Sequence, residues 1–568
     1  MKWTDAQQSA IDAPRPGQLP SQTILVSAAA GSGKTAVLVE RMIQRLKRRE
    51  LSIQELMVVT FTKAAAAEMK ARIGMKLAEE FQATGDAYLE EQLNMLPSAH
   101  ISTLHSFCQW VIRSYFYKLD IDPSFTIGNE GELALMRYDV LDAILLEAYE
   151  QGLYNIYDVS DMFSTERSDQ ILRETVFQIY NFALAQSQPM RWLDQVCHTY
   201  ESALHQTLLE TTWGTLFWKE QQRQIEYLLE RYEEAQRLAT LGNGFDKWLE
   251  KVSELQTLLQ AMQKADTWDG MHVGVVGIGG FSFPVLRATK AMNESDPAIL
   301  SEIKAILAEG KEILQAMPKG VFAITEADWR EQMEYLVPLV RGIMGLVKRF
   351  HEDFQQAKQE AGMIDFSDLE HLCLALLVDP EFTEELKPSE VALELQDTFK
   401  EVMVDEYQDT NGVQEAIVNL VSRGDNRFYV GDVKQSIYGF RMADPQLFME
   451  KYHRFDHDVN SVERRIDLSQ NFRSHEAILN VTNFIFSQIM TDEGAGLTYG
   501  EAEALHTGRI VEEAPPEWVG GDVEVHVLCC DEDKAQTDSE DGEDLENDEK
   551  EMLFVIRKIQ ELKNNGAL

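Results

Sequence analysis

The most informative stretch of this chain is Ala28-Ala29-Ala30-Gly31-Ser32-Gly33-Lys34-Thr35. It follows an apolar run at residues 23–26 and precedes a helical pattern, which is typical of a strand, a phosphate-binding loop and a helix. Backbone N–H groups of such a loop point at phosphate oxygens, and the helix N-terminus adds the positive end of its dipole. Lys34 can reach the β- and γ-phosphates of ATP, and the Thr35 hydroxyl can bind Mg²⁺. Ala28 stands where the general pattern has its first glycine.

A second segment, Val404-Asp405-Glu406-Tyr407-Gln408-Asp409, follows another apolar run at residues 402–404. Two adjacent carboxylates at a strand end allow Asp405 to hold the metal ion and Glu406 to activate a water molecule. Each pattern alone also has an ordinary explanation, a chance match for the loop and a plain strand end for the acidic pair. Their joint occurrence, each after its own predicted strand, favours a site that hydrolyses ATP.

Length and composition limit the classes of protein. A chain of 568 residues is too long for one core and predicts three or four domains. The N-terminus does not read as a signal peptide and no run of 18 apolar residues occurs, so we expect a cytoplasmic protein without a membrane association. The five cysteines show no C-x-x-C spacing, which argues against a disulfide framework, a zinc ribbon or an iron–sulfur site.

The net charge of −43 is unfavourable for binding DNA phosphates through lysine and arginine. Part of the excess is local, because residues 531–551 carry twelve carboxylates and two lysines and predict a solvated acidic loop. The remainder is spread along the chain and is interpreted as a solubility signature. A DNA-binding strip needs to be basic only locally.

The predicted elements divide the chain into an α/β part, a helical part and a second α/β part. Strand patterns lie at residues 23–26, 57–60, 101–104, 398–404 and 427–430. Their alternation with helical patterns predicts a parallel sheet formed by residues 1–129 and 356–455, while residues 130–355 show long helical periodicities. We therefore expect a helical domain inserted into the sheet domain, with the strands that contain Val26 and Val404 side by side.

Two smaller predictions concern the rest of the chain. Residues 456–568 are expected to begin a second, incomplete α/β domain, with strands at 463–468 and 522–527 and a helix at 550–563. The glycine-rich residues 270–280 lack the spacing of a dinucleotide site and are expected to form a loop.

Three further segments surround the predicted strands: Thr4-Asp5-Ala6-Gln7-Gln8, Thr60-Phe61-Thr62-Lys63-Ala64-Ala65 and Ile101-Ser102-Thr103-Leu104-His105-Ser106-Phe107. The Gln7 amide can read both the donor and the acceptor edge of adenine. The other two segments place hydroxyls and an aromatic ring at strand C-termini, where α/β sheets bind ligands. Hydroxyls position phosphates and aromatic rings stack bases, so Phe61 and Thr103 are candidate DNA contacts.

Two later segments complete the set: Val430-Gly431-Asp432-Val433-Lys434-Gln435-Ser436-Ile437-Tyr438-Gly439-Phe440-Arg441 and Leu468-Ser469-Gln470-Asn471-Phe472-Arg473-Ser474. Gln435 is placed to contact a γ-phosphate, and Tyr438 and Phe440 follow closely enough to touch bases. Arg473 is a candidate arginine finger. Each aromatic residue taken singly is more often part of a core, but the ordered series at strand ends favours base contacts.

These segments resemble the UvrD/RecB-like superfamily 1 DNA helicases over roughly residues 1–125 and 360–480. Within that group the residues after Val430, the segment from Leu468 and the segment Ile364-Asp365-Phe366-Ser367-Asp368-Leu369 look most like the AddA family of helicase–nuclease subunits. The resemblance implies RecA-like motor domains, the helical insertion being similar to the family's 1B domain. UvrD-type proteins have Asn-Lys in place of Lys63-Ala64, and Phe472 stands where tyrosine is common.

The resemblance also implies residue roles. For ATP and Mg²⁺ these are Gln7 on adenine with Phe472 stacking, Lys34 and Thr35 on phosphate and metal, Asp405 on the metal, Glu406 activating water, Gln435 sensing the γ-phosphate and Arg473 as the finger. For the DNA strand they are Thr62, His105, Tyr438 and Phe440.

For function, the resemblance implies a 3′→5′ ATP-dependent DNA helicase with an exonuclease. It would act on single-stranded and duplex DNA in a heterodimer with an AddB-like subunit, repairing double-strand breaks by homologous recombination. Later helicase motifs and the nuclease have no counterpart before Leu568, so we expect the N-terminal part of a longer protein. Two alternatives stay open: a UvrD/PcrA-type repair helicase without a nuclease, and an ATP-binding module without turnover.

Overall fold

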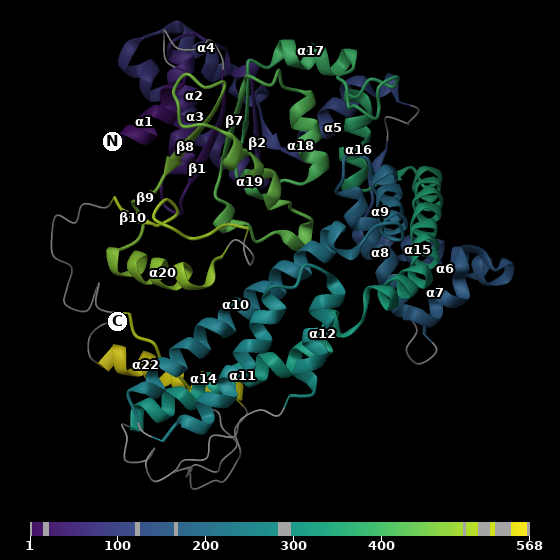
Figure 1. The fold of residues 1–568 in the computed structure, drawn as a ribbon. Helices are drawn as coiled ribbons and strands as arrows, with labels where there is room; N and C mark the ends of the chain where they lie inside the picture. The colour runs from purple at the N-terminus through teal and green to yellow at the C-terminus, as the bar shows by residue number, and fades with distance from the viewer. Residues whose placement is uncertain are drawn as a thin grey trace. The chain divides into compact units, whose positions relative to one another are not determined.

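Strands that are far apart in the sequence assemble one parallel sheet in the computed structural model of the chain (Figure 1). The structure describes residues 3–14, 22–119, 125–163, 168–242, 244–281, 297–491, 496–508, 523–528 and 547–564. The chain divides into two units. Unit 1 comprises residues 1–128, 184–187 and 362–568, and unit 2 comprises residues 129–183 and 188–361.

The sheet of unit 1 has six parallel strands in the order β3-β2-β6-β7-β1-β8. The strands are β1 Thr23–Ala28, β2 Leu56–Thr60, β3 His100–Thr103, β6 Glu401–Val404, β7 Arg427–Gly431 and β8 Glu463–Leu468. Leu56 pairs with Glu401, so β2 and β6 are neighbours although the helical segment separates them in sequence. The predicted α/β fold with a parallel sheet is confirmed.

Both faces of the sheet are covered, which explains why its strands read as continuous apolar runs. Side chains alternate between the faces: Ile24 and Val26 join one core and Leu25 joins the other. The first core contains helices α1 Asp5–Asp12, α2 Lys34–Lys47, α3 Lys63–Thr84 and α4 Ala87–Met95. The second contains α5 Leu104–Tyr115, α16 Phe366–Leu377, α17 Glu390–Thr398, α18 Gly412–Leu420 and α19 Pro445–Arg454.

Two short parallel strand pairs and two further helices also belong to the described part of unit 1. They are β4 Thr126–Ile127 with β5 Met363–Ile364, β9 Gln470–Asn471 with β10 His506–Thr507, α20 Glu476–Ile489 and α22 Asn547–Asn564. The β4–β5 pair joins the two chain ends of the insertion, because Gly128 N–H donates to the Ile364 carbonyl over 2.9 Å.

Unit 2 is helical and has a core of its own. Its helices are α6 Glu130–Gln151, α7 Ile156–Phe163, α8 Gln170–Leu184, α9 Pro189–Ala203, α10 Thr212–Thr240, α11 Asp246–Gln263, α12 Trp268–Gly279, α14 Pro297–Ala316 and α15 Glu326–Glu360. The prediction of a loop at residues 270–280 is wrong, because most of this segment lies in α12. A Cβ on Gly274 would lie 2.1 Å from the Met262 side chain, so this glycine lets α12 approach α11 closely.

The strand order corrects two expectations. β7 lies between β1 and β6, so the strands of Val26 and Val404 share the sheet but are not side by side. β8, expected to open a second sheet after residue 456, pairs with β1 along its whole length and completes the first sheet. Sequence patterns locate the strands. The order of the strands in the sheet depends on where each crossover connection places the next strand.

The C-terminal expectations have mixed outcomes. Residues 523–528 are described and form no strand, which contradicts the strand expected at 522–527. The helix expected at 550–563 lies within α22. Of the acidic loop expected at 531–551, residues 531–546 lie outside the described residues and 547–551 begin α22. Among the helices that the structure describes, none combines the length and apolarity needed to cross a bilayer.

Candidate functional site

The loop between β1 and α2 depends on two glycines with left-handed backbone conformations. Gly31 has φ +68° and Gly33 has φ +88°, a region that other residues rarely adopt. A Cβ on Gly31 would also lie 2.9 Å from Asn471 Nδ2, so the chain passes too close for any side chain. Gly33 precedes α2, whose first N–H groups have no partner within the helix. The loop therefore presents N–H donors at a helix N-terminus, the arrangement that binds phosphate.

Side chains from two distant segments fix the loop from outside. Gln7 Nε2 donates to the Ser32 carbonyl over 2.9 Å, and Asn471 Nδ2 donates to the Ala30 carbonyl over 2.7 Å. Phe472 N–H donates to the Gly31 carbonyl over 3.0 Å. These bonds engage the carbonyls of the loop. Gln7 Oε1 accepts from the Thr4 N–H, which is part of the N-terminal cap of α1. The Gln7 amide therefore binds both the loop and this cap. The contact of Gln7 with adenine stays a prediction.

Two of the three predicted catalytic residues, Glu406 and Gln435, meet Lys34 near the ends of β1, β6 and β7. Lys34 Nζ lies 2.9 Å from Glu406 Oε2 and 3.4 Å from Gln435 Oε1. Glu406 has φ +53°, a strained conformation for a residue with a side chain, at the turn that follows β6. Strain of this kind is typical of positions where the surrounding structure holds a side chain in a required direction.

Asp405 has the features of a metal ligand. Its Oδ1 is buried and has no hydrogen-bond partner among the described residues. Burial, followed by the nearby Glu406 carboxylate, raises the pKa of Asp405 to about 6. Thr35 is the second residue of α2 and is half-buried. An unpaired carboxylate oxygen fits Mg²⁺, which takes one or two protein carboxylates together with substrate phosphates. No group of three or more His, Cys, Asp or Glu side chains that could hold a metal ion occurs in the part of the chain that the structure describes.

A cavity of about 540 Å³ connects the carboxylates to the predicted DNA contacts. It lies at the C-terminal ends of β2, β3 and β6 and is lined by Phe61, Thr103, His105, Asp405, Glu406 and Arg441, among others. The structure therefore brings together residues that the sequence placed in separate segments.

Three aromatic rings and one guanidinium form a half-buried to exposed cluster, called here the aromatic cluster: Phe61, Tyr438, Phe440 and Arg441. The Phe61 and Tyr438 ring centroids lie 4.3 Å apart, and those of Tyr438 and Phe440 lie 5.6 Å apart. The Arg441 guanidinium carbon lies 5.5–5.8 Å from all three centroids. Because 72% of Phe440 is exposed, the alternative that it is a core residue is excluded.

Two of the predicted DNA contacts already have structural roles. Thr62 Oγ1 accepts the Ala65 N–H over 3.0 Å and caps α3. Thr103 Oγ1 accepts the Ser106 N–H over 3.3 Å and caps α5. Both hydroxyls satisfy the first turn of a helix, and their contacts to DNA stay predictions.

His105 lies over a carboxyl group that the sequence did not single out. His105 Nε2 is 3.3 Å from Glu370 Oε1, which also accepts a 2.8 Å hydrogen bond from Gln414 Nε2. Burial raises the pKa of Glu370 to about 7, and burial with the nearby cations Arg441 and Lys63 lowers the pKa of His105. The available signal was a glutamate next to Leu369 in a helix whose later residues are mostly apolar.

The segment after β8 places Phe472 and Arg473 beside the loop. The N–H of Phe472 bonds to the loop, and a Cβ on Gly31 would lie 2.9 Å from Arg473 Cβ. Sequence reasoning missed Asn471 and Gln408, which hold the backbone of the loop and the carboxylates. No local pattern marks either residue, because each has a partner that is far away in the sequence, Asp432 for Gln408 and Ala30 for Asn471.

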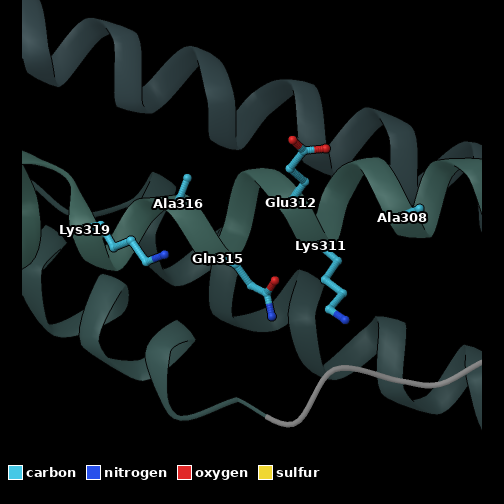
Figure 2. A pocket seen from close by; sticks show the side chains of 6 residues that line it. All are labelled: Ala308, Lys311, Glu312, Gln315, Ala316 and Lys319. Atoms are coloured by element: carbon cyan, nitrogen blue, oxygen red, sulfur yellow. The ribbon is translucent and has the colours of Figure 1, made fainter. Parts of the chain in front are cut away.

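A second hollow lies on α14 and the turn after it in unit 2 (Figure 2). Its polar side chains do not converge: Figure 2 shows Glu312 pointing to the opposite side of the helix from Lys311 and Gln315. A binding site needs polar groups aimed at one place, so we assign no function to this hollow.

Comparison with known proteins agrees with this geometry. The model of the UvrD/REP helicase N-terminal domain matches residues 3–320 and 341–456. The chain belongs to this family. The matched residues of this UvrD/REP-type domain include the phosphate-binding loop, the carboxylates and the aromatic cluster.

Curated relatives match nearly the whole chain, and each is named as a subunit of an ATP-dependent helicase/nuclease. The relative from Geobacillus kaustophilus is 38% identical over 99% of the chain and 45% of its own length. The proteins of the same name from Geobacillus thermodenitrificans and Desulforamulus reducens are 39% and 36% identical, over 99% and 98% of the chain and 45% and 46% of their own lengths. The chain therefore spans about half the length of the curated relatives it matches.

Proposed function

We propose that this chain is the ATP-dependent motor of a DNA helicase–nuclease that moves 3′→5′ along a strand. One observation carries the proposal. The segment 432–441 contains Gln435, which contacts Lys34, the half-buried ring of Tyr438 and the exposed ring of Phe440. A nucleotide contact and a base-stacking surface therefore lie within ten residues of one another. The name that the relatives share, which contains the words ATP-dependent helicase/nuclease, supports the same activity.

In the proposed reaction, the N–H groups of the loop and Lys34 bind the phosphates. The Glu406 carboxylate accepts a proton from the attacking water, Gln435 contacts the γ-phosphate and Arg473 stabilises the charge that develops there. Phe472 stacks on the adenine and Gln7 reads its edge. Mg²⁺, held by Thr35 and Asp405 when bound, would neutralise charge on the β- and γ-phosphates.

In the proposed DNA site, bases stack on the aromatic cluster. Base–aromatic stacking is tolerant of sequence, as a motor that moves along any strand requires. Phosphates lie near Thr62, Thr103 and His105, and Arg441 supplies local positive charge despite the acidic chain. Because the relatives are named as one subunit of a larger enzyme, their names support a partner protein, which we propose is AddB-like. The complex would repair double-strand breaks in the cytoplasm through homologous recombination.

Two substitutions test the ATP site. Lys34→Ala should weaken nucleotide binding and abolish turnover, because the loop loses its cation. Glu406→Gln should keep nucleotide binding and lower turnover by about 10²-fold or more, because an amide cannot accept the proton. ATP hydrolysis and nucleotide affinity are measured with and without single-stranded DNA. Glu450→Gln, an exposed carboxylate on α19, is the matched control.

The outcomes discriminate between the alternatives. Full turnover in Glu406→Gln would refute the assignment of the base. Nucleotide binding without turnover in the unmodified chain would favour an ATP-binding module. Single-strand-stimulated turnover is the result we expect, and nuclease assays on the longer protein would then separate a helicase–nuclease from a UvrD/PcrA-type helicase.

A further inference from the structure

The Gln408 side chain lies between the two parts of the site and uses both its N–H donors and its carbonyl oxygen in hydrogen bonds. Gln408 is 1% exposed. Its Nε2 donates to Glu406 Oε2 over 3.0 Å and to Asp409 Oδ2 over 3.1 Å. Its Oε1 accepts the Asp432 N–H over 3.0 Å. One amide therefore connects the proposed catalytic base to the first residue after β7.

Asp432 extends this connection toward the aromatic cluster. The Asp432 side chain is buried, and its Oδ2 accepts from Gln435 Nε2 over 2.7 Å. Its Oδ1 pairs with Lys434 Nζ at 2.8 Å. Ser436 Oγ donates to the Gln408 carbonyl over 3.4 Å, so the backbone of residue 408 is attached to the same segment. The segment reaches Tyr438 two residues later.

Close packing makes the two segments move together. A Cβ on Gly431 would lie 2.5 Å from Gln408 Oε1, so only glycine leaves room for the amide at this position. Leaving a buried amide group without its partner costs on the order of 1–3 kcal/mol. When residues 432–441 shift, moving Gln408 with them therefore costs less free energy than breaking its hydrogen bonds.

We propose that Gln408 is a positioning residue that couples strand binding on the aromatic cluster to the orientation of the Glu406 carboxylate. The proposal rests on the function proposed above. Glu406 Oε2 has two partners on opposite parts of the site, Lys34 Nζ at 2.9 Å and Gln408 Nε2 at 3.0 Å. If Gln408 moves, its hydrogen bond to Glu406 Oε2 changes relative to the bond from Lys34. The Glu406 carboxylate then changes its orientation toward the attacking water.

Gln435 contacts the site at a different residue. Its Oε1 reaches Lys34 only at 3.4 Å, and its Nε2 is held by Asp432. It therefore contacts the residue that binds phosphate rather than the base. By thermodynamic reciprocity, a coupling through Gln408 also requires that nucleotide binding changes strand affinity by the same factor as the strand changes nucleotide affinity.

The test is Gln408→Met, which keeps the length of the side chain and removes its three hydrogen bonds. ATP hydrolysis is measured with and without a single-stranded oligonucleotide, and oligonucleotide affinity is measured with and without a non-hydrolysable ATP analogue. We expect the ratio of stimulated to basal kcat to fall by about 5-fold or more, within the usual range of coupling. The analogue's effect on oligonucleotide affinity should fall by the same factor, whereas the KM for ATP and the affinity without analogue stay close to those of the unmodified chain.

The control is Gln396→Met, because Gln396 is another glutamine of unit 1 that donates only to a backbone carbonyl, that of Leu420 over 2.8 Å. Gln408→Glu is the second variant, since it keeps an acceptor for Asp432 N–H and loses both donors. Loss of coupling in both folded Gln408 variants supports the proposal. Full stimulation in a folded Gln408 variant overturns the coupling role alone. Absence of stimulation in the unmodified chain overturns the proposed function.

Discussion

At the scale of single residues, Glu370 has the most unusual environment near the candidate DNA site. Only 5% of the residue is exposed, on the face of α16 that packs toward α5 and α18. Burial raises the pKa of Glu370 to about 7; the Gln414 hydrogen bond opposes this and the Asp365 carboxylate adds to it. His105, its ring partner, has a lowered pKa because it is also buried. For both groups, burial disfavours the charged form more than the neighbouring residues stabilise it.

This environment makes the free energy of unfolding depend on pH. The pKa of Glu370 is higher in the folded chain, about 7, than its ordinary value of 4.5. Its contribution to stability is therefore fully present below about pH 4.5 and is lost as pH rises through about 7. Glu370→Gln keeps the shape and the Gln414 contact without an ionisable group. We expect the variant to gain stability relative to the unmodified chain above pH 7, by on the order of 3 kcal/mol at most.

Melting temperatures across that pH range measure this effect. Glu390→Gln, whose side chain is 90% exposed, is the control and should leave the pH dependence unchanged. Parallel curves for Glu370→Gln and the unmodified chain would show that Glu370 keeps its ordinary pKa in the folded state.

Residue identities in the site were predictable where chemistry requires a residue type at a fixed distance from a strand end. Lys34, Glu406 and Gln435 satisfy this condition, and Lys34 Nζ lies 2.9 Å from Glu406 and 3.4 Å from Gln435. Gln408 and Asn471 do not satisfy it. Gln408 has one partner 24 positions away, Asp432, and Asn471 has one 441 positions away, Ala30. Only the folded sheet brings these pairs together.

At the scale of elements, the segment 432–441 follows the C-terminal end of β7 and carries the rings of Tyr438 and Phe440, which makes it suited to base stacking. Phe440→Ala should weaken single-strand affinity by roughly 5- to 150-fold, since stacking is worth ~1–3 kcal/mol per base. The loss should depend little on salt, because a ring neutralises no phosphate. Stability should change by less than about 0.5 kcal/mol, because an exposed side chain leaves no cavity.

Arg441→Ala is the contrasting variant, because its loss removes a charge and should reduce the salt dependence of binding. Affinities at two salt concentrations, together with melting temperature and nucleotide affinity, distinguish the two effects. If Phe440→Ala lowered stability and both affinities in proportion, the ring would have a structural role instead.

The positions of strands in the sequence were easier to predict than which strands lie next to one another in the sheet. The five strand patterns proposed in the two α/β parts correspond to β1, β2, β3, β6 and β7, because each is an apolar run between turn residues. The position of β7 between β1 and β6, and of β8 beyond β1, follows from backbone pairing that leaves no trace in local periodicity. The helix α12 was missed because glycine counts against helices locally, whereas packing against Met262 favours it.

At the scale of the whole molecule, the two units have separate cores. Unit 1 buries side chains on both faces of its sheet, and unit 2 has its own cluster around Trp268, Tyr232 and Phe322. The phosphate-binding loop, the carboxylates and the aromatic cluster all belong to unit 1. A ligand that binds only to the folded form of unit 1 should therefore stabilise that unit.

We expect two calorimetric transitions, of which a non-hydrolysable ATP analogue with Mg²⁺ raises only one. At about one hundred times its Kd, the analogue should add about 2.7 kcal/mol to the stability of unit 1, which is several degrees in its Tm. Lys34→Ala should remove the shift and keep both transitions, because the loop and not the core is altered. A single transition, or an equal shift of both, would show that the sheet and the inserted helices unfold as one cooperative body. The insertion would then contribute directly to the stability of the nucleotide site, and substitutions in its core, such as Trp268→Ala, would lower nucleotide affinity as well as stability.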